Sequence, residues 1–363
     1  GIGQPKHDLS SKTEQEIIEQ LDSLFTDAVR LEYEKDVEYG YRHLTDLSGG
    51  LDSRMNTWIA NELGYQDIVN LTYCISNYTD EQVSKKISAK FGTELIFAPL
   101  DHIRFLTDID QIIAMNFGLF YFAGLTGGQR LLQNLNMEAF GVEHTGQIGD
   151  VVVGSFIHKK RSLCASIYRS GFYSDKRVDL LNPYSLPDAY NQEMYMMRVR
   201  AFNGAMSSHI IRRNYTEVVS PFLNVEFFDF CMSIPVNMRM NHYLYHQWLK
   251  QKHPGAARFI WEKTGLRPGA PLLLVKLFRR YLRLKRTIFN LPNSMNPFDR
   301  WCKEKPEIIT KWDQYLQSKL ETEHLSEDLR SILLQAYQGG CAIEKMLVLT
   351  ALGAIHYYFD ETR

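Results

Sequence analysis

A glycine-rich turn between two patterned segments constrains the fold of this chain more than any other feature. Residues 41–47 are apolar enough for a short strand, and residues 53–64 place apolar side chains at helical spacing. The turn between them, residues 48–52, reads SGGLD. A strand-to-helix turn of this kind directs backbone N–H groups and a helix N-terminus at one point, and that arrangement favours an anion.

The residue types in this turn indicate which anion. Two glycines let the backbone approach a ligand closely, and Ser48 and Ser53 add hydroxyl donors. Asp52 would repel a phosphate unless a cation lay between them. The simplest account is a polyphosphate that carries Mg²⁺, with Asp52 as a metal ligand. An ordinary glycine turn capped by Ser and Asp is the alternative, because short glycine-rich motifs recur by chance.

Strand and helix patterns alternate through the first 150 residues. The segments are a helix (13–34), strands (67–75, 93–100 and 137–144), a helix (79–92) and a long helical region (108–135). Such alternation predicts a doubly wound α/β fold, a parallel sheet with helices on both faces. From about residue 190 the patterns are almost all helical. We expect an N-terminal helix and linker (1–39), an α/β domain (40–240) and a helical extension packed on it (241–363).

Composition argues against a nucleic-acid-binding protein, a membrane-spanning protein and a disulfide framework. The net charge of −1 gives no reason to expect nucleic acid, and the longest apolar run, residues 347–359, is too short to span a membrane. The five cysteines are scattered without a Cys-x-x-Cys motif, as expected in a reducing compartment, so we expect a cytoplasmic protein. The chain opens on Gly1 without a signal-peptide pattern, which is compatible with trimming at that end.

A second glycine-rich segment has the same combination of residue types as the first and also follows a predicted strand. The strand predicted over 137–144 runs into TGQIGD, which combines close glycines, a hydroxyl group and Asp150. Ligands of a parallel sheet bind outside the carboxyl ends of its strands. Two such turns, each with an acidic residue, could hold one Mg²⁺–nucleotide between them.

The motif SGGLDS resembles the pyrophosphate loop of the N-type ATP pyrophosphatases, which have an adenine nucleotide alpha hydrolase-like fold. Within them, the chain resembles the synthetase domain of the asparagine synthetase family, which includes the β-lactam synthetases. Three further segments are similar to the family's SGEGSD, RxPFLD and RxKxGF segments. They read TGQIGD (145–150), VVSPFLNVEFFDFCMSIPVNMR (218–239) and WEKTGLRPG (261–269).

The resemblance implies an AMP-forming carbon–nitrogen ligase. ATP binds at the strand ends, and the carboxylate of a small acid attacks its α-phosphate to give an acyl-adenylate and pyrophosphate. Ammonia or another amine then displaces AMP and forms an amide. The implied cofactors are ATP and Mg²⁺.

Carried over position by position, the resemblance also implies the site residues. Those that cradle the pyrophosphate are Ser48, Gly49, Gly50, Asp52 and Ser53. Those beside the rest of the nucleotide are Leu47 and Tyr73, which flank the adenine, and Gly146 beneath it. Asp52 and Asp150 are the implied Mg²⁺ ligands. Lys263 would neutralise charge that builds on the α-phosphate, with Arg258 or Arg267 as the alternative source of that charge.

Three departures from the family pattern bear on activity. Gln147 stands where the family has Glu, and an amide can orient a nucleophile but cannot take its proton. Asn224 replaces the Asp of PFLD, and Arg54 follows the loop where a small residue is usual. These departures favour a divergent member with a substrate other than aspartate. They leave open an enzyme that closes a ring with an internal amine, or a degenerate nucleotide-binding scaffold in a biosynthetic complex.

Two further features concern partners. Glutamine-dependent relatives expose an N-terminal cysteine nucleophile, whereas the first cysteine here is Cys74. We therefore expect ammonia or an amine from a glutaminase domain or subunit that is absent here, and no use of glutamine by this chain alone. The basic run 276–286 favours a solvated helix face, with a phosphate, a partner or a membrane surface as alternatives.

Overall fold

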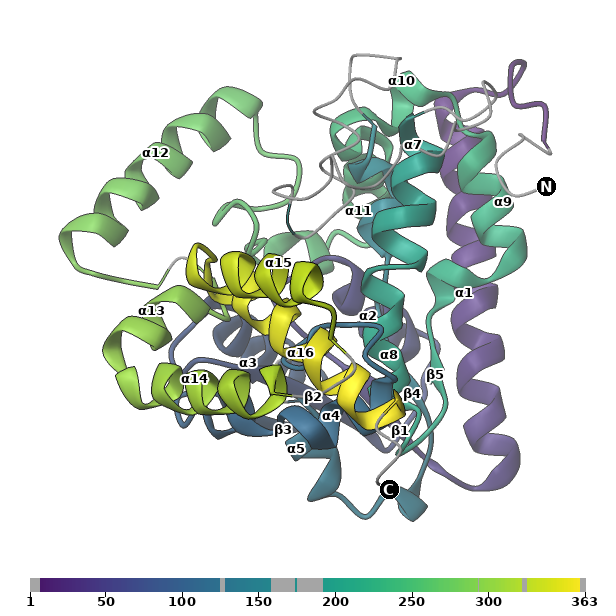
Figure 1. Cartoon of the computed structure of the whole chain (residues 1–363). Helices are drawn as coiled ribbons and strands as arrows, with labels where there is room; N and C mark the ends of the chain where they lie inside the picture. Colours follow the sequence, from purple (N-terminus) through teal and green to yellow (C-terminus); the bar gives the residue numbers. More distant parts are fainter. Residues whose placement is uncertain are drawn as a thin grey trace.

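The computed structural model describes residues 7–124, 128–157, 174, 192–292, 294–321 and 325–359. Its centre is an all-parallel sheet of five strands in the order β3-β2-β1-β4-β5 (Figure 1). The strands are β1 (Arg42–Asp46), β2 (Ile68–Cys74), β3 (Glu94–Pro99), β4 (Phe140–His144) and β5 (Val218–Val219). The predicted α/β class with a parallel sheet is confirmed. β5 was not predicted, because two residues are too short to show a pattern.

The strand order reverses between β1 and β4. From β1 the chain moves outward to β2 and β3 on one side, and later places β4 on the other side, with Thr45 of β1 opposite His144 of β4. In open parallel sheets, ligands bind in the crevice at such a reversal. Both glycine-rich turns follow these two strands.

Helices of both halves of the chain cover one face of the sheet. The longest, α1 (Glu14–Tyr39), starts at a capping box of Thr13 and Glu16 and ends at Gly40. It packs with α2 (Asp52–Glu62), α9 (Val225–Ser233) and α11 (Tyr243–Lys252) around a core that includes Phe25 and Trp248. Segments more than 200 residues apart in sequence therefore meet above the first loop.

The other face of the sheet has its own apolar contacts. Leu44, Val69 and Leu71 point to this face and pack with Leu131 and Leu132 of α5 (Gly128–Gln133). Side chains alternate between the two faces of a strand, so the neighbouring His43 and Thr45 point the opposite way, toward α1. The α3 helix (Thr79–Phe91) contacts β2 and β3 from the face that α1 covers, where Asn70 of β2 donates to Ser88.

The C-terminal part of the chain is helical, as predicted. Its helices are α12 (Leu272–Ile288), α13 (Phe298–Glu304), α14 (Pro306–Leu320), α15 (Glu327–Gln338) and α16 (Ala342–Phe359). Buried residues of α14 and α16, among them Trp312 and Leu349, pack with α4 (Ile109–Asn116) in a second core. None of the described helices is long and apolar enough to cross a membrane.

The helical region predicted over 108–135 is wrong as a single helix. α4 ends at Asn116, and the next two residues have positive φ, 59° at Phe117 and 70° at Gly118. Asn116 fixes this break, because its side chain donates to Phe120 O (2.8 Å) and accepts from Gly118 N (2.9 Å). The predicted domain boundaries at 40 and 241 stay predictions, and most of 158–191 lies outside the described residues.

Candidate active site

A pocket of about 250 Å³ lies at the carboxyl ends of β1, β2 and β4. Eight of the predicted site residues line it, namely Leu47, Ser48, Gly50, Asp52, Ser53, Tyr73, Gly146 and Gln147. The lining also includes Asp80 from α3 and Met295 from the segment after α12, which sequence reasoning did not identify. Gly49, Asp150 and Lys263 lie beside it through the contacts described below. The structure therefore gathers the predicted residues at one place.

Side-chain oxygen atoms accept hydrogen bonds from the backbone N–H groups of the first loop. Ser48 N donates to Ser53 Oγ (3.1 Å), Gly50 N donates to Ser48 Oγ (3.1 Å) and Gly49 N donates to Asp80 Oδ1 (2.9 Å). We expected these groups to meet an anion directly. Instead the loop holds its shape through side-chain oxygens, which a phosphate would have to replace.

Arg54 joins this loop to a distant segment. It is fully buried on α2, and its guanidinium donates to the carbonyl oxygens of Gly49 (3.0 Å), Ala256 (3.2 Å), Phe259 (3.2 Å) and Ile260 (2.6 Å). Burial lowers the pKa of Arg54 to about 10. Glu262 N also donates to Gly49 O (3.0 Å). The departure at position 54 thus has a structural role: it fixes the segment that carries Lys263 against the first loop.

The second loop packs directly on the start of α2. A Cβ atom at Gly146 would lie 2.2 Å from Ser53 N, so only glycine allows this approach. Asp150 N donates to Asp52 Oδ2 (2.9 Å), and Asn56 Nδ2 donates to Thr145 O (3.1 Å). The two glycine-rich turns therefore form one structure, although Asp52 and Asp150 are 98 residues apart in sequence.

Asp52 is a half-buried acidic group of the site, and both of its oxygen atoms accept hydrogen bonds. Its Oδ1 accepts from the Tyr245 hydroxyl (3.0 Å), while its Oδ2 accepts from Asp150 N. Burial, and then the charge of Asp150, raise the pKa of Asp52 to about 7. Burial also raises the pKa of Tyr245. Tyr245 lies on α11, and no sequence pattern connected it with the loop.

The carboxylates around the pocket fit a divalent cation. Asp52 and Asp150 lie on the two loops, and Asp80 has a buried Oδ2 atom without a hydrogen-bond partner among the described residues. Burial is the main cause that raises the pKa of Asp80 to about 6. The negative charge of Asp150 acts unfavourably on Asp52, and carboxylate oxygens are the ligands that Mg²⁺ prefers. Asp80 is therefore a further candidate ligand beside the two predicted ones.

Lys263 reaches the second loop. Its Nζ lies 3.8 Å from Asp150 Oδ2 and 5.5 Å from the centre of the Trp261 ring. Both charged side chains are nearly half exposed, 45% for Lys263 and 44% for Asp150, so the ion pair itself is weak. An exposed, loosely paired ammonium group can move toward a bound phosphate. Its role stays a prediction.

A buried ion cluster fixes Tyr73 in the lining of the pocket. Arg212, from α8 (His209–Arg212), donates to the Tyr73 hydroxyl and to Glu143, and lies 3.0 Å from Asp46. Burial raises the pKa of Glu143 to about 7, although Arg212 opposes this. No sequence pattern indicates Arg212, because its partners come from three different strands.

Of the departures from the family pattern, Asn224 caps a helix and Gln147 lines the pocket. The side chain of Asn224 accepts from Glu226 N (3.1 Å) and Phe227 N (3.2 Å), which is an N-cap of α9. Asn and Asp are about equal as N-caps, so this substitution removes no function of the cap. Gln147 lines the pocket, and its backbone carbonyl oxygen accepts from Ser220 Oγ (3.0 Å).

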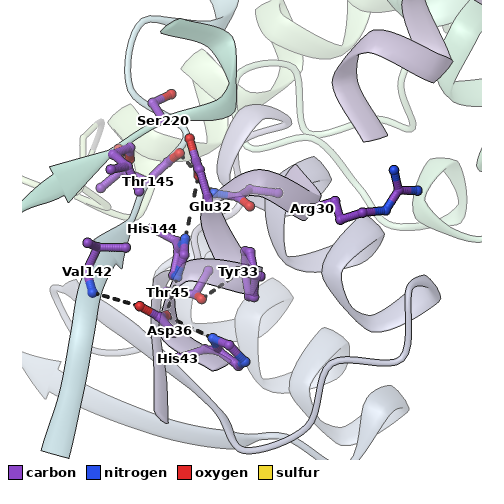
Figure 2. Close-up of polar contacts among 12 residues, drawn as sticks. Arg30, Glu32, Tyr33, Asp36, His43, Thr45, Val142, His144, Thr145 and Ser220 are labelled. Carbon is purple, nitrogen blue, oxygen red and sulfur yellow. Dashed lines mark hydrogen bonds and ion pairs between the residues drawn. The ribbon is translucent and has the colours of Figure 1, made fainter. Parts of the chain in front are cut away.

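A buried polar cluster between α1, β1 and β4 lies next to the site (Figure 2). Asp36 of α1 accepts from His43 Nδ1 (2.9 Å), His144 Nε2 (2.7 Å) and Val142 N (3.0 Å). His144 also stacks on Tyr33, with 3.9 Å between ring centres. These contacts hold the start of β1 and the C-terminal part of β4 against α1, and β4 leads directly into the second loop.

The comparison with known proteins agrees with the resemblance. Among curated proteins the chain has no match. The family model described as asparagine synthase matches residues 20–123, which include the first loop, β2 and Asp80. The second loop and Lys263 lie outside the matched residues, so their assignment rests on the geometry above. Over residues 20–123 the chain is similar to the asparagine synthase family, which supports an ATP-dependent amide-forming synthetase in general.

Proposed function

We propose that this chain adenylates a small carboxylic acid with ATP and transfers the acyl group to ammonia or another amine. The observation that carries the proposal is the contact between the two loops, where Asp150 N lies 2.9 Å from Asp52 Oδ2 and Gly146 covers Ser53. This contact supports one shared site for a nucleotide polyphosphate. The family match supports ATP-dependent amide formation in general.

Different residues of the pocket would bind the adenine, the phosphates and the metal ion. Leu47 and Tyr73 would flank the adenine, and residues 48–53 would hold the pyrophosphate once the side chains on their N–H groups have turned away. Asp52 and Asp150, with Asp80 beside them, would hold Mg²⁺, which when bound shields the negative charge of the phosphates. Gly146 lets the second loop lie close to the nucleotide.

Two bond exchanges make up the reaction. An oxygen of the substrate carboxylate attacks the α-phosphorus, the bond from that phosphorus to the bridging oxygen breaks, and pyrophosphate leaves. Lys263 would stabilise the extra charge on the α-phosphate oxygens during this step. The amine then attacks the acyl carbon and AMP leaves with the bonding electrons. Gln147 can orient the amine, whose proton must go to another acceptor.

Gln147 keeps a second candidate function in view. A protein without a base at this position could bind the nucleotide and serve as a scaffold in a biosynthetic complex. Exchange of labelled pyrophosphate into ATP, measured with a panel of carboxylic acids, separates the two functions. We expect exchange that depends on one class of acid. Binding of ATP with no exchange under any acid would favour the scaffold.

Product analysis separates the two enzymatic versions. With an acid that supports exchange, the reaction is run with and without ammonium. An amide formed only with ammonium, or with an added amine, supports the proposed intermolecular transfer. A cyclic product formed without either would identify an intramolecular reaction of the β-lactam synthetase kind. A cytoplasmic location, where ATP is abundant, stays part of the proposal.

A further inference from the structure

The helix α12 is attached to the molecule along one side only. None of its 17 residues, all of which are described, is buried, and Figure 1 shows it projecting from the rest of the chain. Its inner side bears Phe278 and Leu282, which face Gly265; a Cβ atom at Gly265 would lie 2.7 Å from the Phe278 ring. Arg279 donates to Lys263 O (3.2 Å). The rest of the helix surface faces away from the protein.

The exposed surface of α12 carries a continuous row of apolar side chains. We call this row the apolar stripe; its members are Leu273, Leu277, Tyr281, Leu284 and Ile288. They are spaced three or four residues apart, which places them on one helix face. Their exposed fractions are 54–72%, and Phe289 and Leu291 extend the stripe beyond the helix. Apolar surface left in water at this scale is typical of an interaction site.

Positive charge surrounds the apolar stripe. No Asp or Glu occurs from Lys263 to Phe298, whereas eight Lys or Arg residues do. Five of these lie exposed on α12, namely Lys276, Arg279, Arg280, Arg283 and Lys285. From the 100° turn per residue, Arg280 and Lys285 fall on the two opposite borders of the stripe. The whole chain has a net charge of −1, so this concentration is local.

We propose that α12 binds the surface of an anionic lipid bilayer. The apolar stripe would enter the boundary between headgroups and acyl chains, and the bordering Arg280 and Lys285 would contact lipid phosphates. A bilayer supplies an apolar layer beneath spread negative charge, and this matches an apolar row bordered by cations on both sides. Because Lys263 and Met295 precede and follow α12 and both lie at the site, the pocket would sit close to the membrane.

Vesicle flotation of the full chain tests the proposal. The vesicles contain phosphatidylcholine alone or phosphatidylcholine mixed with phosphatidylglycerol. We expect binding to the mixed vesicles, little binding to the neutral ones, and a loss of binding as salt is added. No binding to mixed vesicles, or equal binding to both kinds, would overturn the proposal.

Two variants and one matched control locate the binding surface. The triple change Arg280→Gln, Arg283→Gln and Lys285→Gln should weaken vesicle binding by about a hundredfold, as should Leu273→Ser with Leu277→Ser and Leu284→Ser. The control changes Lys35, Lys85 and Arg213 to Gln, which removes the same charge from side chains that are 55–59% exposed elsewhere. It should bind nearly as well as the unmodified chain. An equal loss in the control would contradict a specific role of α12.

A second measurement separates lipid from protein as the occupant of the stripe. Leu277→Trp should show a blue shift of its added fluorescence with mixed vesicles, which does not depend on a loss of function. Size-exclusion chromatography without lipid should show the same oligomeric state for the unmodified chain and the Leu→Ser variant. If the unmodified chain is an oligomer, the Leu→Ser variant is a monomer and the Trp variant shows no fluorescence shift, the apolar stripe binds a second copy of the chain instead.

Discussion

At the residue scale, the role we propose for Lys263 lies in the transition state rather than in ground-state binding. Its ammonium group is half exposed and only 3.8 Å from Asp150, so it can follow charge that develops on a bound phosphate. Lys263→Ala should lower turnover by about 10²-fold and leave ATP affinity nearly unchanged. Pyrophosphate release, measured with an acid that supports exchange, gives the rate.

Arg267→Ala is the matched control for that change. It removes a positive charge from the same segment, and we expect near-normal turnover. If the Arg267 variant lost activity and the Lys263 variant did not, the charge on the α-phosphate would come from Arg267.

Asp36 is the residue whose loss should destabilise the fold most directly. Its buried carboxylate accepts three hydrogen bonds, two of them from imidazoles (Figure 2). Asp36→Ala would leave these donors buried without an acceptor, at a cost of about 3 kcal/mol or more. Urea unfolding measures the change. Asp27→Ala, at a side chain 53% exposed, should change the free energy of unfolding by less than about 0.5 kcal/mol; equal effects would refute the role of the cluster.

Sequence reasoning found the residues that belong to motifs and missed those that support them. Asp52 and Asp150 stand beside glycines in recognisable turns, so their place at the sheet edge could be predicted. Arg54, Tyr245 and Arg212 act through partners that are 69–206 residues away in sequence apart from Gly49. A contact of that kind leaves no local periodicity or spacing to recognise.

At the element scale, the fit of the second loop on α2 depends on the absence of one side chain. Gly146→Ala would place a methyl group 2.2 Å from Ser53 N, against backbone that cannot turn aside. The loop must then move away, and ATP affinity should fall by about tenfold or more, with a stability loss of about 1–3 kcal/mol. Calorimetric titration with Mg·ATP and urea unfolding measure the two effects.

Gly339→Ala is the control for the glycine change. The nearest atom to a Cβ at Gly339 is 3.5 Å away, an ordinary contact. Normal ATP affinity in this variant is expected. Normal affinity in the Gly146 variant as well would mean that the second loop does not contribute to nucleotide binding.

A second contact between elements makes stability depend on pH. His253, just after α11, donates to Asp22 of α1 (2.8 Å) and to Glu62 of α2 (2.8 Å). Burial lowers the pKa of His253, but these two hydrogen bonds outweigh it and raise the pKa from its ordinary 6.5 to about 9. The stabilisation that comes from this raised pKa is fully present below pH 6.5, and it is lost as the pH rises through 9.

The free energy of unfolding should therefore fall between pH 6.5 and 9.5, by on the order of 3 kcal/mol at most. His253→Gln should be less stable at the lower pH and should lose this slope. Urea unfolding across the range gives both curves. Parallel curves for the variant and the unmodified chain would show that another group causes the pH dependence.

Elements with long, regular patterns were predictable, and elements set by tertiary contacts were not. α1, α3, β2 and β3 were placed to within a few residues, because their apolar periodicity is clear. The break after α4 could not be predicted, because the side-chain hydrogen bonds of Asn116 to the backbone create it and a glycine or proline alone does not. β5 is held in place by bonds to β4 rather than by its own sequence.

At the scale of the whole molecule, the topology explains why one pocket collects residues from the entire chain. The strand order reverses between β1 and β4, so the turns after both strands face the same crevice. Helix α11 adds Tyr245 to it, and the segment before α12 adds Lys263. The sequence predicted the sheet edge as the site, whereas the contribution of Tyr245 required the folded chain.

We propose that both loops together hold one Mg·ATP, and calorimetric titration tests this binding without knowledge of the acid substrate. ATP should bind in the presence of Mg²⁺ and lose most of its affinity when a chelator removes the metal. Asp52→Asn should lower Mg·ATP affinity by about tenfold or more, and Asp27→Asn should leave it unchanged. Equal affinity with and without Mg²⁺, together with unchanged affinity in Asp52→Asn, would contradict the claim.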